Sequence, residues 1–69
     1  MLRLRIKELA EERGISQSKL SRMSDVHITT IRRLYSNPFG GVNILTLEKI
    51  AQALGVEISD LTEKVPDEN

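Results

Sequence analysis

The chain has no cysteine and no tryptophan, and its 69 residues include one tyrosine and one phenylalanine. Without cysteine there can be neither disulfide bonds nor thiolate metal sites. Because aromatic residues make up only 3% of the composition, the core must be built from aliphatic side chains. No apolar run approaches the roughly 18 residues of a membrane span, and the charged N-terminus lacks the apolar centre of a secretory signal. We therefore expect one small, soluble, cytoplasmic domain whose stability rests on helix packing.

Groups that carry out catalysis are also scarce. The chain has one histidine and no glycine-rich phosphate loop. Glu11 and Glu12 are adjacent on a predicted helix, so their carboxylates point in different directions and do not form a catalytic pair. We expect no enzymatic activity, no cofactor, no metal ion and no small-molecule ligand.

The formal net charge is zero, but the charges are distributed unevenly along the chain. Residues 1–35 carry eight basic and four acidic side chains, whereas residues 36–69 carry two basic and six acidic ones. A molecule polarised in this way can turn a basic face toward phosphates while its acidic part faces away. Such asymmetry also arises by chance in short chains, so it favours a nucleic-acid partner without establishing one.

Apolar residues at three- and four-residue spacing predict an all-α fold without strands. Residues that cap or end helices divide the chain into short segments: Gly14, Ser16, Asn37–Pro38, Asn43 and Gly55. The pattern predicts five helices, at about residues 3–13, 17–24, 27–35, 44–54 and 58–63. The polar, proline-containing tail 65–69 is expected to fray, which leaves a single domain over residues 1–64.

The most informative segment is residues 17–36, QSKLSRMSDVHITTIRRLYS. It is predicted to form two short helices joined by a tight turn at Asp25 and Val26, with the small Ser21 where the helices come closest. Four apolar residues have the spacing that packs the two helices together: Leu20, Val26, Ile31 and Leu34. The second helix then exposes residues of the kinds that contact base edges in DNA: His27, Ile28, Thr29, Arg32 and Arg33.

Three stretches, IKELAEERGISQSKLS, TTIRRLYSN and TLEKIAQALGVEISDL, make the chain resemble the lambda-repressor-like, Cro and Xre-type helix-turn-helix regulators over about residues 4–62. The resemblance implies a compact five-helix DNA-binding domain with the helix-turn-helix at its second and third helices, and a transcriptional repressor as the function. The chain departs from the family pattern where Asp25 replaces a common glycine, Ser21 a common alanine and Tyr35 a common glutamate. The loop SNPFGGVNI is also atypical.

The resemblance also implies how the residues divide between bases and phosphates. It places the third predicted helix in the major groove of double-stranded DNA, where the expected base-contacting residues are His27, Ile28, Thr29, Arg32 and Arg33. Arg33 is the strongest candidate, because a guanidinium can donate two hydrogen bonds to one guanine. The start of the second helix and the loop after the third are expected to contact the DNA backbone through Ser16, Gln17, Ser18, Lys19, Arg22, Asn37 and Asn43.

Each of these assignments has a structural alternative. His27 could be an ordinary residue at a helix N-terminus, and Ile28 could pack against the fourth helix or a partner subunit. Arg32 and Arg33 could be solvated helix charges. The two aromatic residues, Tyr35 and Phe39, fit packing or a subunit interface better than base stacking.

The resemblance further implies a homodimer on a palindromic operator, with half-sites about 34 Å apart. Candidate apolar residues for the subunit interface are Phe39, Val42, Ile44, Leu61 and Val65. A second hypothesis keeps the fold but changes the partner: the chain could be an antitoxin or an adaptor that mainly binds another protein. The zero net charge favours a protein partner, whereas the arginine pair on the third helix favours DNA.

Overall fold

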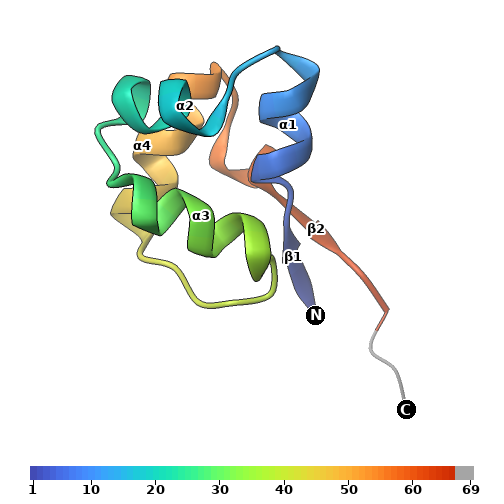
Figure 1. The fold of residues 1–69 in the computed structure, drawn as a ribbon. Helices are drawn as coiled ribbons and strands as arrows, with labels where there is room; N and C mark the ends of the chain where they lie inside the picture. The colour runs from blue at the N-terminus through green and yellow to red at the C-terminus, as the bar shows by residue number, and fades with distance from the viewer. Residues whose placement is uncertain (67–69) are drawn as a thin grey trace.

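The computed structural model describes residues 1–66. In this part of the chain, four α-helices, one 3-10 helix and two short strands follow one another in the order β1 (Leu2–Leu4), α1 (Ile6–Glu12), α2 (Gln17–Ser24), α3 (Ile28–Ser36), α4 (Ile44–Leu54), η1 (Ile58–Leu61) and β2 (Thr62–Lys64). The helices gather into one body, and the paired strands run away from it toward the N-terminus (Figure 1). Within residues 1–66 no helix is long and apolar enough to cross a membrane.

The core is aliphatic, as the composition predicts. Its largest fully buried side chains come one from each helix: Ile6, Leu20, Ile31, Ile50 and Leu61. Further buried Leu, Val and Ala residues complete a single cluster. Because each such side chain contributes about 1.5–3 kcal/mol when fully buried, this cluster supplies the main force that holds the short helices together.

The predicted helix boundaries in the middle of the chain are confirmed by their capping contacts. Ser16 Oγ accepts a hydrogen bond of 3.1 Å from the N–H three residues later, and Asn43 Oδ1 accepts one of 2.7 Å from the N–H two residues later. After α1 and α4, Gly14 and Gly55 adopt left-handed conformations with φ of 66° and 71°, which glycine reaches without the steric cost of a Cβ. As a result, α2 and α4 have the predicted bounds, and α3 is displaced by one residue.

The prediction of a fold without strands is wrong, because the two ends of the described chain pair as antiparallel strands. Arg3 of β1 lies opposite Glu63 of β2. The pairing continues past the strands, since the N–H of Val65 donates to the carbonyl of Met1 at 2.9 Å. Val65, which we expected to begin a frayed tail, is therefore held by the sheet. Residues 67–69 of that predicted tail lie outside the described residues.

The first helix is correspondingly shorter than predicted. It begins at Ile6 instead of residue 3, because residues 2–4 are extended and paired with β2. Arg5 is the N-cap, and its side chain makes no capping hydrogen bond. The helix ends at Glu12, with Arg13 as its C-cap.

The fifth predicted helix is a single 3-10 turn, η1, so the fold has four α-helices within residues 1–66. A capping box sets its start: the N–H of Glu57 donates to Asp60 Oδ2 at 3.0 Å. Thr62 ends the turn in an extended conformation (φ −127°, ψ 154°) and begins β2. The expected helix over 58–63 is cut short because its last residues pair with β1 instead.

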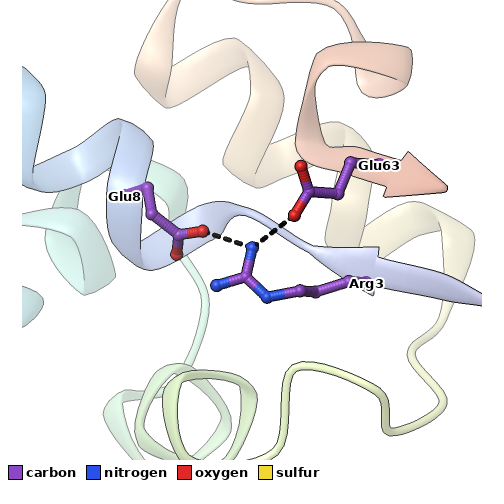
Figure 2. Close-up of polar contacts among 3 residues, drawn as sticks. All are labelled: Arg3, Glu8 and Glu63. Atoms are coloured by element: carbon purple, nitrogen blue, oxygen red, sulfur yellow. Dashed lines mark hydrogen bonds and ion pairs between the residues drawn. The ribbon is translucent and has the colours of Figure 1, made fainter. Parts of the chain in front are cut away.

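A cluster of three charged side chains joins β1, α1 and β2 (Figure 2). Arg3 Nη1 lies 2.5 Å from Glu8 Oε2 and 2.8 Å from Glu63 Oε1. Burial raises the pKa of the Glu8 carboxyl, but the hydrogen bonds from Arg3 and the backbone, together with the positive charges of Arg3 and Arg5, outweigh it, so this pKa lies below its ordinary value. The hydrogen bond to Glu8 likewise raises the pKa of Arg3. Because two carboxylates neutralise Arg3, this residue does not add to the free positive charge of the N-terminal half.

Tyr35, the residue that replaces the family's glutamate, is a packing residue. Its half-buried ring packs against the hydrophobic core. Burial raises the pKa of the Tyr35 phenol above its usual value of 10.0, and the negative charge of Glu11 on α1 raises it further. The structural alternative for this aromatic residue is therefore confirmed.

Ile31→Ala tests whether the aliphatic core holds α3. Ile31 is 0% exposed, so the substitution should leave a cavity and lower the free energy of unfolding by about 2–5 kcal/mol. Ile44→Ala is the matched control, because Ile44 is 57% exposed and its truncation should change the free energy by only about 0.5 kcal/mol. Urea unfolding followed by far-ultraviolet circular dichroism measures both. Equal losses in the two variants would contradict this account of the core.

The absence of tryptophan and of other tyrosines allows a direct measurement of the Tyr35 pKa. Phenolate absorbance in the native protein should titrate above pH 10.0, whereas the same titration in denaturant should give a value of about 10. Because the folded pKa is the higher one, the stability that this shift contributes is present below the unfolded pKa and is lost as the pH rises through the folded pKa. Tyr35→Phe should remove this part of the alkaline destabilisation. A native midpoint at or below the denatured one would show that the ring is solvated.

Candidate nucleic-acid interface

The turn between α2 and α3 is held by local contacts that the sequence departures preserve. Asp25 adopts the left-handed conformation (φ 57°, ψ 35°) that its family-typical glycine would adopt, as expected for a residue type that tolerates this region. Ser21 Oγ donates to the Val26 carbonyl at 2.5 Å, and the Val26 N–H donates to the Ser21 carbonyl at 3.2 Å. Leu20 and Val26 are buried beneath the turn. The predicted two-helix unit is confirmed, and Ser21 adds a hydrogen bond that alanine could not make.

The helix α3 has one buried side and one exposed polar side. Ile31 and Leu34 are 0% and 2% exposed and face the core, as predicted. The exposed side is a continuous row of residues at positions i, i+3, i+4 and i+7, which we call the polar stripe: Thr29, Arg32, Arg33 and Ser36. Three of these four residues were predicted to contact DNA. Ser36 was not among the predicted residues, and its hydroxyl donates a hydrogen bond of 2.8 Å to the Arg32 carbonyl.

The residues at the start of α3 have structural roles as well. His27 is the exposed N-cap of the helix, and its Nδ1 accepts a hydrogen bond of 3.2 Å from the Thr29 N–H. The interpretation of His27 as a residue of the helix N-terminus is therefore confirmed. Ile28 is half-buried and packs against the core cluster, which leaves only part of its side chain at the surface.

The two arginines of the polar stripe differ in their surroundings. Arg33 Nη1 donates a hydrogen bond of 3.1 Å to the carbonyl oxygen of Gly41, in the loop between α3 and α4. Arg32 makes no hydrogen bond or ion pair with the rest of residues 1–66 through its side chain. Arg33 is thus positioned by the protein, whereas the guanidinium of Arg32 is solvated.

The residues predicted to contact phosphates lie at the surface, but they differ in exposure and in their hydrogen bonds within the fold. The α2 positions Ser18, Lys19 and Arg22 are exposed, and Gln17 is half-buried. The remaining three predicted residues are exposed and also hold the fold: the side chains of Ser16 and Asn43 cap helices, and the carbonyl of Asn37 accepts a hydrogen bond from the Gly40 N–H.

The charge of this region is positive and locally uncompensated. Helices α2 and α3 carry four basic residues, Lys19, Arg22, Arg32 and Arg33, and no carboxylate. Asp25 in the turn is the one acidic residue between Gln17 and Ser36. Such a surface attracts polyanions despite the zero net charge of the whole chain.

The candidate residues for a subunit interface are only partly available. Leu61 is 0% exposed, so its prediction as an interface residue is wrong: its side chain belongs to the core. Phe39 and Ile44 are exposed, and Val42 and Val65 are half-buried. Leu45, beside Ile44 in the first turn of α4, is exposed as well and was not predicted.

A shallow hollow lies elsewhere on the surface, between α4 and η1. It has a volume of about 290 Å³ and is lined by Glu48, Ala51, Gln52, Val56, Glu57 and Ile58. None of the predicted DNA-contacting residues lines it, and its two carboxylates would repel phosphates. Within residues 1–66, no group of three or more histidine or acidic side chains is arranged to hold a metal ion.

The arrangement of α2, the left-handed turn and the polar stripe of α3 defines a helix-turn-helix DNA-binding domain. A family model described as the Cro/C1-type HTH DNA-binding domain matches residues 5–67. Because the match covers nearly the whole chain, the protein belongs to this family, which confirms the resemblance drawn from the sequence. A comparison with curated proteins gave no match.

Proposed function

We propose that the chain is a sequence-specific transcriptional repressor that places α3 in the major groove of double-stranded DNA. The polar stripe carries this proposal, because Ile31 and Leu34 fix one side of α3 while the opposite side presents two arginines. A recognition helix needs both properties to meet base edges at a defined angle. Occupation of the DNA would block other proteins, which makes repression the mode of regulation that we propose. The proposal involves no catalysis, cofactor or small-molecule ligand, and it places the protein in the cytoplasm.

The base contacts that we propose follow from the chemistry of each exposed side chain. Arg33 would donate two hydrogen bonds to O6 and N7 of a guanine. Thr29 would hydrogen-bond a base or touch a thymine methyl, and the exposed part of Ile28 would add an apolar contact to thymine. His27 and Arg32 flank these residues, at the helix start and beside Arg33.

The phosphate contacts that we propose are centred on the start of α2. Its first N–H groups have no partner of their own within a helix and carry partial positive charge, which favours a phosphate. Ser16, Gln17, Ser18 and Lys19 lie at this end of the helix, and Arg22 lies in its last turn. Asn37 and Asn43 would contribute from the loop after α3.

Arg33→Ala tests the base contact. After the preferred sequence has been selected from random duplexes, the substitution should weaken binding to it by about 1–3 kcal/mol, with the loss confined to one base pair. Arg22→Ala is the matched contrast, because loss of a phosphate contact should weaken binding to all duplexes alike and reduce the salt slope by about 1. Fluorescence anisotropy at several salt concentrations measures both effects. Sequence-specific recognition is contradicted if the native protein binds every duplex with equal affinity. The base contact of Arg33 is contradicted if Arg33→Ala binds each duplex as tightly as the native protein does.

We also propose that two copies bind one palindromic operator. A single α3 can contact only a few base pairs, and a two-fold dimer doubles the site while half-sites stay about 34 Å apart. The exposed apolar residues Phe39, Ile44 and Leu45 are available to a second subunit.

The stoichiometry of the complex tests the dimer. Sedimentation equilibrium with the selected duplex should give two protein copies per duplex, and the selected sequence should be a palindrome. Disruption of one half-site should weaken binding of both copies if they contact each other. One copy bound to an asymmetric sequence would contradict the dimer while leaving DNA recognition intact.

A further inference from the structure

We propose that the backbone carbonyl of Gly41 positions the Arg33 guanidinium for base contact, so that the loop between α3 and α4 is a determinant of sequence specificity. The proposal rests on the proposed function, because it assumes that Arg33 contacts a base. The observation behind it is the 3.1 Å hydrogen bond from Arg33 Nη1 to the Gly41 carbonyl. Both residues are exposed, so this contact forms at the surface that α3 presents to DNA.

The Gly41 carbonyl can position a side chain only if the loop itself is fixed. Figure 1 shows this loop running along α3 from its C-terminal end back toward the start of α4. Before Gly41, the carbonyl of Pro38 accepts a hydrogen bond of 2.7 Å from Leu4, and the Gly40 N–H closes a turn onto the Asn37 carbonyl at 3.0 Å. After it, Asn43 is held as the N-cap of α4. The carbonyl thus lies between two anchored points.

The first of these anchors comes from the terminal sheet. Just beyond the two ends of the β1–β2 pair, the Arg5 N–H donates to the Leu61 carbonyl and the Val65 N–H donates to the Met1 carbonyl. The odd-numbered residues at this end of the chain therefore direct their hydrogen bonds toward the segment that contains β2. In an antiparallel pair, residues that alternate with the hydrogen-bonded ones direct their N–H groups away from the partner strand. The Leu4 N–H points away from β2 in this way and donates to the Pro38 carbonyl. The sheet therefore anchors the loop whose Gly41 carbonyl accepts the hydrogen bond from Arg33.

The guanidinium retains enough donors to contact a base while it is held. Arginine has five N–H donors in a planar fork, and a bidentate contact with guanine needs two of them. The bond to Gly41 uses one donor on Nη1, which leaves the edge formed by Nε and Nη2 available. A side chain already held in one orientation loses less conformational freedom on binding.

The hydrogen bond between Arg33 and Gly41 could also serve only to stabilise the loop. If Arg33 only ties the loop to α3, loosening the loop should change affinity for every duplex to the same extent. If Gly41 positions Arg33, loosening the loop should change the discrimination at the base pair that Arg33 contacts. Discrimination at single base pairs therefore separates the two roles.

The experiment displaces the carbonyl by inserting one glycine between Gly40 and Gly41. The matched control inserts one glycine between Val65 and Pro66, because this position follows the last hydrogen bond of the terminal sheet and leaves the loop between α3 and α4 unchanged. Each variant is measured alone and combined with Arg33→Ala, against the selected duplex and its single-base-pair variants. Thermal unfolding checks that each variant is folded.

The insertion should reduce discrimination at the base pair assigned to Arg33 by about tenfold, in the range of one bidentate contact. The control insertion between Val65 and Pro66 should leave this discrimination unchanged. In the Arg33→Ala background the insertion should have no further effect on that base pair, which is the coupling expected of two groups in contact.

Unchanged discrimination in the folded insertion variant would overturn the proposal and leave Arg33 as a base-contacting residue independent of the loop. A different failure would concern the proposed function. If Arg33→Ala changes the discrimination at no single base pair while the loop is intact, then Arg33 does not contact a base. The two failures are distinguished because the second appears without any change in the loop.

Discussion

The burial of Ile31 and Leu34 in the aliphatic core is the interaction on which the rest of the structure depends. The helix α3 has nine residues, and isolated helices of that length are marginal in water, so tertiary packing must supply its stability. The same packing decides which side of α3 faces outward. The direction in which the polar stripe faces is therefore a consequence of core packing. Because aliphatic side chains supply this packing, a helix-turn-helix surface can be built on a chain without disulfides or aromatic core residues.

A second constraint connects the ends of the described chain to the loop beside α3. Pairing of β1 with β2 leaves the Leu4 N–H free to hold the Pro38 carbonyl, and Gly41 follows in the same anchored loop. The contacts of Arg3 with Glu8 and Glu63 join this sheet to α1. The sheet is thus part of the support for the candidate interface, although it lies apart from it in the sequence.

The helices and the turn could be predicted from the sequence because their signals are local: Ser16 and Asn43 cap, Gly14 and Gly55 end helices, and apolar spacing marks the buried sides. The strands could not, because each has only three residues and their pairing joins opposite ends of the chain. The start of α1 was misplaced for a related reason, since no capping side chain precedes Ile6 and residues 2 and 6 also fit a helical spacing. The hydrogen bond between Arg33 and Gly41 depends on a loop conformation that spacing does not encode.

The departures from the family pattern have unequal consequences for recognition. Asp25 and Ser21 keep the turn in its usual form, because one adopts the left-handed conformation and the other adds a hydrogen bond. The atypical loop, in contrast, places a carbonyl against Arg33, in the second half of α3. At the start of the helix, Ile28 is half-buried and His27 is occupied as the N-cap, so both have less freedom to adapt to a base. We therefore expect the sequence preference that distinguishes this chain from its relatives to arise mainly from the Arg33 end of α3.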